Sequence, residues 1–268
     1  MSMITARRPL QRPRLYWFFA DSFQLLTRSL LHIRQDLDQL MTVTLQPIIF
    51  LLLFRYTFGG SIETGNISYP SFLVTGLLVM DMAFTATTTG IGIATDLQQG
   101  IIDRFRSLPM VKSAVLVGHI TADLLRSLIT IIITVAVGLM VGFHPHAGFI
   151  QWLAVIGLLL LTTLALSTAS AITGIVGKSI EFVQQIGFLW ILPLMFLSGI
   201  LAPTTGMPQW LRWFADNQPI SQVVIAVRAL LLDQPAGDHV WLSLIWLIGI
   251  TVLAFPLASW LFRRKTIQ

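Results

Sequence analysis

One segment of the sequence looks like the end of a phosphate-binding loop. Gly174-Ile-Val-Gly-Lys178-Ser179 ends in Gly-Lys-Ser, as loops do whose backbone N–H groups hold nucleotide phosphates. The full pattern also requires a glycine five residues before the Gly-Lys-Ser glycine, and Ile172 occupies that position. An apolar run, not a strand, precedes the segment. We therefore expect no nucleotide to bind here, and we interpret Lys178 as an anchor on the inner side of a membrane.

The histidines do not form a recognisable metal-binding pattern. His144 and His146 are the only close pair, and no carboxylate near them in the sequence offers a third ligand. The chain has no cysteine, which excludes disulfides, thiolate metal sites and cysteine nucleophiles. No nucleophile elbow and no HExxH motif occur. We expect no catalytic centre and no metal site in this chain.

Asp81 is the one acidic residue deep inside an apolar run. A charge at the centre of a bilayer costs about 2.5–3.5 kcal/mol on insertion scales, so such a residue is a candidate functional group. Two interpretations stay open: a polar contact or proton site in a transport cavity, and a hydrogen-bonded residue in helix packing. Asp123 and Arg126 are spaced to pair on one helix face, and we interpret that pair as structural.

The composition is that of a membrane protein. The chain has 268 residues, of which 55% are hydrophobic and 11% charged, and its mean hydropathy is +0.79. Soluble domains have roughly 25% charged residues. The net charge of +5 would suggest nucleic acid in a soluble protein, but the charges lie in short clusters between apolar runs. This placement indicates orientation in a membrane and argues against nucleic-acid binding.

The hydrophobic pattern predicts an all-α integral membrane protein, with residues 1–268 forming a single transmembrane domain. Each apolar run is near the ~20 residues that cross a bilayer core. The six predicted spans are 41–58, 71–94, 116–141, 149–176, 182–201 and 240–262. Within 149–176, Ser167, Ala171 and Gly174 follow three- to four-residue spacing, which predicts close helix packing.

Two further helical features flank the spans. Residues 15–40 are amphipathic, and we interpret them as a helix in the cytoplasmic interface; the alternative is an ordinary helix packed on a soluble core. Residues 202–239 contain four prolines and two short apolar segments separated by Asn217-Gln-Pro219. This pattern predicts a re-entrant hairpin in the outer leaflet, where its non-helical backbone must be covered by protein or water.

The basic residues indicate the orientation of the chain. With six spans and the N-terminus inside, thirteen lysines and arginines lie in inner segments, and two, Arg212 and Arg228, lie in the outer segment. Arg55 and Arg126 fall within spans. This bias follows the positive-inside rule. We therefore expect both termini on the cytoplasmic side of the cytoplasmic membrane.

The inner loop at 95–112 contains both charge and apolar surface. A helix is predicted from Thr95 to Ser107, ending before Pro109, because the residue before proline disfavours helix. Asp103 and Arg104 expose both signs of charge, while Ile101 and Phe105 contribute an apolar face. Such a helix suits docking onto a cytosolic partner. A solvated connector is the alternative.

Four motifs recur in this order in a known family: Ser68-Tyr-Pro-Ser-Phe-Leu73, Gly100-Ile-Ile-Asp-Arg-Phe-Arg-Ser-Leu-Pro109, Phe196-Leu-Ser-Gly-Ile-Leu-Ala-Pro203 and Gln218-Pro219-Ile220. With the interfacial helix and six spans, they resemble the permease subunit of type 2 ATP-binding cassette exporters, in particular the daunorubicin-resistance-like branch. The resemblance covers nearly the whole chain.

The resemblance implies a function and partners. It implies ATP-driven export of an amphiphilic or hydrophobic compound by two permeases, identical or different, and two ATPase subunits. ATP and magnesium would be bound by the ATPases and not by this chain. The first inner loop would be a coupling helix docked on the ATPase. Its residues would be Gln98, Gln99, Gly100, Ile101, Asp103, Arg104, Phe105, Arg106, Leu108 and Pro109.

We expect the substrate pathway to be bordered by Asp81, Phe84, Gln184, Gln185 and Trp190. Two other functions remain open. One is an ion-coupled secondary transporter with Asp81 as the proton site, although we find no inverted repeat of the kind typical of that class. The other is a non-transporting membrane assembly protein.

Overall fold

The computed structural model describes residues 37–60, 62, 64, 67–100 and 114–265, and all regular structure within them is helical. The predicted all-α class is thus confirmed for the described part of the chain. The elements are α2 (Leu37–Phe58), α3 (Tyr69–Gln98), α5 (Ala114–Met140), α6 (Phe149–Val176), α7 (Ile180–Phe196), the 3₁₀ turn η1 (Thr204–Gly206), α8 (Gln209–Asn217), α9 (Pro219–Leu231) and α10 (His239–Lys265).

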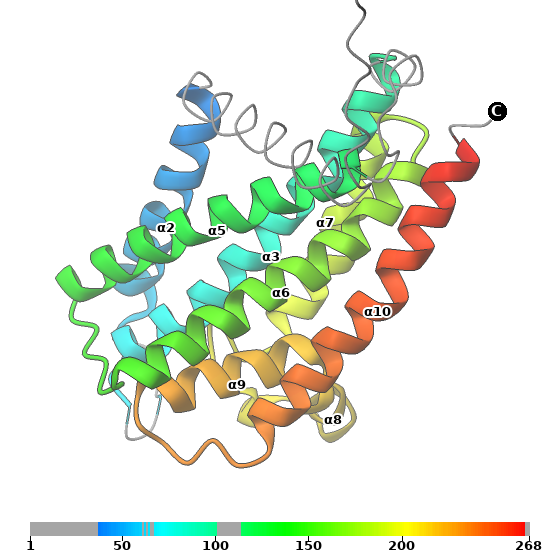
Figure 1. Cartoon of the computed structure of the whole chain (residues 1–268). Coiled ribbons are helices and arrows are strands. Elements are labelled where there is room, and N and C mark those ends of the chain that lie inside the picture. Colours follow the sequence, from blue (N-terminus) through cyan, green and yellow to red (C-terminus); the bar gives the residue numbers. More distant parts are fainter. Residues whose placement is uncertain (1–36, 61, 63, 65–66, 101–113, 266–268) are drawn as a thin grey trace, which may run out of the picture.

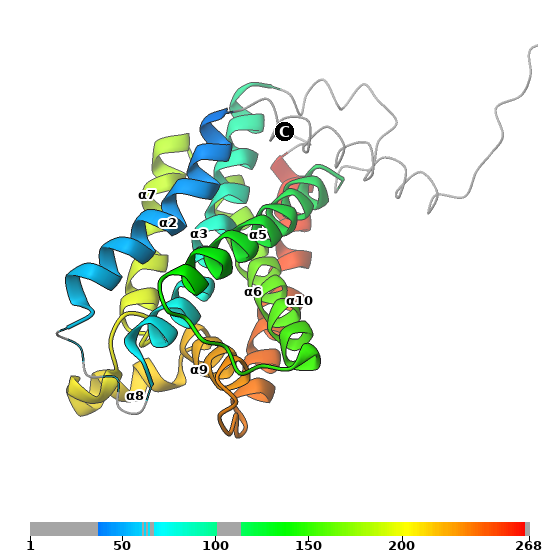
Figure 2. The ribbon, with the colours of Figure 1, turned by 90° about the vertical axis from the view of Figure 1, so that its left-hand side faces the viewer.

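Four helices are long and apolar enough to cross a membrane: Tyr69–Gln98, Val115–Met140, Phe149–Val176 and His239–Lys265. Shorter apolar helices occur at Leu45–Phe58, Ile180–Phe196 and Pro219–Leu231. Of these, α2 and α7 run alongside α3 between the same two ends of the helix bundle (Figures 1 and 2). The multi-pass character predicted from composition is therefore confirmed, while the six spans stay a prediction.

Helix α3 is the centre of the bundle. It contacts α2, α5, α6, α7 and α9. Its residues from Tyr69 to Ala83 are all buried, so this half of the helix is surrounded by protein on every side. The outer helices instead expose large apolar side chains, such as Ile245 and Leu253 of α10. This distribution suits a bundle whose outer surface contacts lipid and whose centre contacts only protein.

The backbones of α3 and α6 touch where small residues meet. A Cβ added at Gly90 would lie 2.6 Å from the carbonyl oxygen of Ser170, and one added at Gly174 would clash with the carbonyl oxygen of Gly90. Such contacts require residues without side chains. The small-residue spacing on α6 indicated this close approach, while Gly90, its partner on α3, was not predicted.

The end of α3 corrects one prediction. Residues 95–98 continue α3, and Gly100 then adopts a positive φ of 64°. A glycine in this left-handed conformation ends a helix, since it has no Cβ to clash with the turn. One unbroken helix over 95–107 is therefore wrong. Residues 101–113 lie outside the described part of the chain. Of the interfacial helix predicted over 15–40, only 37–40 are described, and they form the first turn of α2.

The outer segment forms two helices that meet at Gln218. Pro219 is the first residue of α9, where its missing N–H costs no intrahelical hydrogen bond. Gln218 is extended, and its side-chain amide donates to the carbonyl oxygen of Leu194, 2.6 Å away. Both helices lie at the end of the bundle opposite to the C-terminal end of α10 (Figure 1). The helix–break–helix pattern predicted here is present; its placement in the outer leaflet stays a prediction.

Candidate functional site: a polar pocket between α2, α3 and α5

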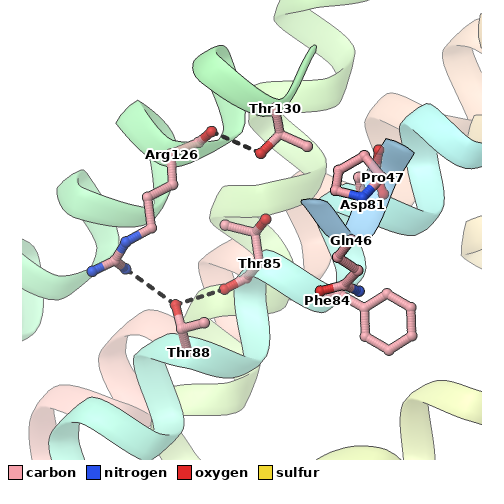
Figure 3. A pocket seen from close by; sticks show the side chains of 8 residues that line it. All are labelled: Gln46, Pro47, Asp81, Phe84, Thr85, Thr88, Arg126 and Thr130. Atoms are coloured by element: carbon pink, nitrogen blue, oxygen red, sulfur yellow. Dashed lines mark hydrogen bonds between the residues drawn. The ribbon is translucent and has the colours of Figure 1, made fainter. Parts of the chain in front are cut away.

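A small pocket of about 60 Å³ lies where three helices meet. It is lined by Gln46 and Pro47 of α2, by Asp81, Phe84, Thr85 and Thr88 of α3, and by Arg126 and Thr130 of α5 (Figure 3). The residues of α3 recur at intervals of three and four, so they share one helix face. Most of the lining side chains are polar, although the pocket lies between apolar helices.

Asp81 is nearly fully buried, with 3% of its surface exposed. Its Oδ2 accepts a hydrogen bond of 2.7 Å from the hydroxyl of Thr134 on α5. Its Oδ1 is also buried and accepts no hydrogen bond from any residue that the structure describes. An ionised carboxylate can accept about four hydrogen bonds. Asp81 is therefore an acceptor with unused capacity on the wall of the pocket.

Asp123 has the opposite environment, since both of its oxygens are hydrogen-bonded. Oδ1 accepts from Thr88 at 2.6 Å and from Arg126 Nη1 at 2.7 Å. Oδ2 accepts from Thr89 and, at 2.9 Å, from Ser167 of α6. The carboxylate is fully buried. The predicted pairing of Asp123 with Arg126 is present, and the Asp123 carboxylate also joins α3, α5 and α6.

Arg126 connects this buried network to the pocket. Its side chain is 17% exposed and lines the pocket, while its guanidinium donates to Asp123 and, at 3.2 Å, to the Thr88 hydroxyl (Figure 3). Arg126 and Asp81 lie at opposite sides of the pocket in this view. The positive charge of Arg126 is thus paired with Asp123 at one end of the pocket, and the Asp81 carboxylate lies at the other end.

Of the predicted pathway residues, the structure brings Asp81 and Phe84 together in the pocket. Gln184 and Gln185 are exposed on α7 and do not line it. Trp190 is half-buried against the core, and its indole N–H has no hydrogen-bond partner among the described residues. The ring of Phe188 approaches Phe84 at 6.2 Å, edge to face, and is one contact between α7 and this region.

The predicted coupling residues are described only in part. Gln98 and Gln99 are exposed at the end of α3, and Gly100 forms the turn that follows. The others lie outside the described residues: Ile101, Asp103, Arg104, Phe105, Arg106, Leu108 and Pro109.

Several pocket residues were not predicted from the sequence. Gln46 and Pro47 interrupt the first apolar run, and Thr85 and Thr88 lie four and seven residues after Asp81. Hydroxyls at these intervals from a buried acid share its helix face. The spacing of Thr85 and Thr88 from Asp81 would therefore have indicated that they line the same site.

A second charged side chain ties the outer segment to α3. The guanidinium of Arg228 on α9 stacks on the ring of Phe72 at 3.7 Å. It also donates to the carbonyl oxygens of Phe72 at 3.2 Å and Gly199 at 3.3 Å, and to the hydroxyl of Thr75 at 3.3 Å. These partners, Phe72, Thr75 and Gly199, are uncharged, which is typical of a structural clamp and not of an ion pair.

No group of three or more histidine, cysteine, aspartate or glutamate side chains that could hold a metal occurs within the described residues. His119 and Asp96, 2.8 Å apart, form a pair between α5 and α3. His144 and His146 are exposed in the loop after α5.

The fold and pocket define a multi-pass membrane protein with a polar site between apolar helices. Comparison with known families makes this more specific. The family model described as ABC-2 type transporter matches residues 21–232, which is most of the chain. The chain belongs to this family.

Known relatives agree with this assignment. A daunorubicin resistance ABC transporter permease protein of Streptomyces coeruleorubidus is 31% identical over 90% of this chain and 85% of the relative. A probable doxorubicin resistance ABC transporter permease protein of Mycobacterium tuberculosis is 26% identical over 93% of this chain and 91% of the relative. A probable multidrug ABC transporter permease of Escherichia coli is 26% identical over 75% of this chain and 54% of the relative.

Proposed function

We propose that this chain is the transmembrane subunit of an exporter that moves an amphiphilic or hydrophobic compound outward across the cytoplasmic membrane, driven by ATP hydrolysis in a separate subunit. The observation that carries the proposal is the family match over residues 21–232, with relatives named as drug-resistance permeases. The pocket supports it, because a lining of polar groups beside Phe84 suits a compound with both polar and apolar parts.

The proposed topology has six spans, formed by α2, α3, α5, α6, α7 and α10, with both termini in the cytoplasm. The distribution of lysine and arginine supports this orientation. The outer hairpin of α8 and α9 would lie in the outer leaflet. Trp210 and Trp213 on α8 are 74% and 71% exposed, as expected of aromatic side chains at a membrane–water interface.

The proposed assembly contains two permease chains, identical or different, and two ATPase subunits that bind ATP and magnesium. The surface from Gln98 to Pro109 would contact the ATPase. Its described residues Gln98 and Gln99 are exposed at the end of α3, the helix that also forms one wall of the pocket. Movement of this segment would therefore be transmitted along α3 to Asp81 and Phe84.

In this mechanism, closure of the ATPases on ATP shifts the permease between inward and outward access. Such a shift requires contacts that differ between the two states. Asp81 and Phe84 would meet the compound in the pocket, and Gln184, Gln185 and Trp190 of α7 would lie farther along its path.

The function is tested by purifying the full chain with the ATPase that copurifies with it and reconstituting both in lipid vesicles. We expect ATP-dependent uptake of amphiphilic fluorescent compounds into inside-out vesicles, abolished when the phosphate-binding lysine of the ATPase is replaced. Transport that persists with the disabled ATPase would refute the proposal and favour an ion-coupled transporter. Copurification without any transport would favour a membrane assembly protein.

The coupling surface has its own test. Combined alanine substitution of Asp103, Arg104 and Phe105 should leave membrane insertion normal and abolish ATPase binding. Replacing Arg263 and Arg264 with alanine provides a control at another inner segment. Retained ATP-coupled transport in the triple variant would contradict this assignment.

A further inference from the structure

Resting on the proposed function, we propose that Asp81 is an ammonium-binding residue and that the pocket selects amphiphiles with a protonated amine. The ammonium group would donate to the Asp81 carboxylate, and the apolar body of the compound would lie on neighbouring phenylalanine rings. Three features of the pocket favour such a ligand: its charge, the acceptor on its wall and the apolar surface beside it.

The charge of the pocket region favours a cation. The described ionisable groups in or directly bonded to the lining are Asp81, Asp123 and Arg126. Arg126 is committed to Asp123 by a hydrogen bond of 2.7 Å, so these two charges cancel. The Asp81 carboxylate is left over. In a low-dielectric site a lone carboxylate is stabilised by a positive charge brought to it, and an anionic ligand would be repelled.

The geometry of Asp81 favours a ligand that donates hydrogen bonds. Thr134 binds Oδ2, while Oδ1 is buried at the pocket wall and accepts from no described residue. An ammonium group supplies up to three donors and a full charge, which makes the bonds to a carboxylate short and strong. A divalent metal would need several oxygen ligands, and the described residues contain no cluster of acids or histidines to provide them.

The apolar body of the ligand has a continuous surface to lie on. We define the phenylalanine row as Phe58, Phe54, Phe50, Phe84 and Phe188, whose adjacent rings have centroids 5.7, 6.1, 6.2 and 6.2 Å apart. The row begins at the end of α2 and passes through Phe84, one helical turn from Asp81. Phe58 and Phe188 are about 40% exposed, so both ends of the row are accessible.

The row and the carboxylate together select a class of compound. Aromatic faces attract cations and pack against flat or hydrocarbon bodies. A compound with an amine at one end and an apolar body can satisfy both at once. A neutral amphiphile would occupy the row alone and supply no charged donor to Oδ1 of Asp81.

The test compares binding of two probes, dansylcadaverine and its N-acetyl derivative, to the full chain in phosphatidylcholine nanodiscs. The probes share the dansyl ring and alkyl chain, but acetylation removes the ammonium charge. We expect the wild type to bind the amine about tenfold or more tightly than the acetylated probe, since a charge-assisted bond is lost. Nanodiscs without protein give the partition background.

Two substitutions separate the parts of the site. Asp81→Asn keeps the size of the side chain and an oxygen for Thr134, and it should abolish the preference for the amine while leaving binding of the acetylated probe unchanged. Phe84→Leu should weaken both probes to a similar degree. Asp96→Asn is the matched control, because Asp96 lies outside the pocket and pairs with His119; it should retain the preference.

Equal affinity of the wild type for the two probes would overturn the proposal without any substitution. So would a preference for the amine that survives Asp81→Asn, or the absence of amine binding. Adding phosphatidylethanolamine distinguishes the source of the ammonium. If this lipid weakens amine binding in the wild type but not in Asp81→Asn, the occupant is a lipid amine; if it has no effect, the occupant is a free amphiphile.

Failure of this inference is distinguishable from failure of the proposed function. ATP-driven export of the acetylated probe as fast as the amine would refute the ammonium site and leave the exporter intact. Binding of the amine that depends on Asp81, without any ATP-driven transport, would leave the ammonium site intact and refute the exporter.

Discussion

Arg126 and Asp123 lie one turn apart on α5, and Nη1 of the arginine donates a 2.7 Å hydrogen bond to Oδ1 of the aspartate. The same carboxylate accepts from Thr88 and Thr89 of α3 and from Ser167 of α6. A single acidic side chain thus holds three helices together in the apolar interior.

We expect Asp123→Ala to be strongly destabilising, by about 3–5 kcal/mol, because it removes the buried carboxylate to which Arg126 and three hydroxyls all donate. The measurement is the melting temperature of the detergent-solubilised chain. Asp216→Ala is the control, since its pair with Arg212 is 3.4 Å long and nearly half-exposed, and Thr204 donates one further hydrogen bond to it at 3.0 Å; its cost should be at most about 2 kcal/mol. Equal losses in the two variants would contradict the central role of Asp123.

The contact between α3 and α6 predicts an asymmetry between two glycines of the same helix. Gly174→Ala should lower the melting temperature, because its Cβ would clash with the backbone of Gly90, which cannot move aside. Gly157→Ala meets nothing within 4 Å and should be neutral or stabilising, by up to about 1 kcal/mol, since alanine favours helix. A similar response at both positions would show that the helices do not approach this closely.

Arg228→Lys tests the clamp between α9 and α3. Lysine keeps the charge but cannot stack on Phe72 and reach the carbonyl oxygens of Phe72 and Gly199 with a planar group. We expect a lower melting temperature, by an amount corresponding to about 1–3 kcal/mol. Arg212→Lys on the exposed face of α8 is the control and should be neutral. A fully stable Arg228→Lys protein would refute the clamp.

The absence of cysteine makes the proposed topology directly testable. Single cysteines at Gln98 and Trp210 occupy exposed positions at the two ends of the bundle. A membrane-impermeant maleimide added to intact cells should label Trp210→Cys and leave Gln98→Cys unmodified, and inside-out vesicles should reverse the result. The cysteine-free parent gives the background. Labelling of both positions from one side would refute the orientation.

Features that depend on the local pattern of the chain were predictable. Apolar runs indicated the membrane character, and the spacing of Asp123 and Arg126 indicated their pairing, because both follow from helical periodicity. The small residues around Gly174 indicated a close contact for the same reason. The prediction of one helix over 95–107 was wrong because Gly100 adopts a left-handed conformation that ends α3. The pattern of apolar and charged residues does not show which conformation a glycine adopts.

Features that depend on which helices become neighbours could not be predicted. Asp81 and Phe84 were singled out, but their grouping with Gln46 and Thr130 requires α2 and α5 to flank α3, which no spacing within one helix specifies. Arg228 was assigned to the outer side by counting charges, and its stacking on Phe72 joins residues far apart in the sequence. Gln184 and Gln185 of α7 were predicted to border the pathway, but they lie outside the pocket.

The bare contact between Gly90 and Gly174 has a mechanical consequence for the pocket. Two backbones in direct contact cannot slide or tilt past one another without collision, so α3 and α6 are expected to move together as one rigid pair. Among the walls of the pocket, α2 packs chiefly against α3 and α5, and Pro47 removes one of its internal hydrogen bonds beside the lining. We therefore expect α2 to bend at Pro47 more readily than α3 and α6 move apart, which would change the width of the pocket.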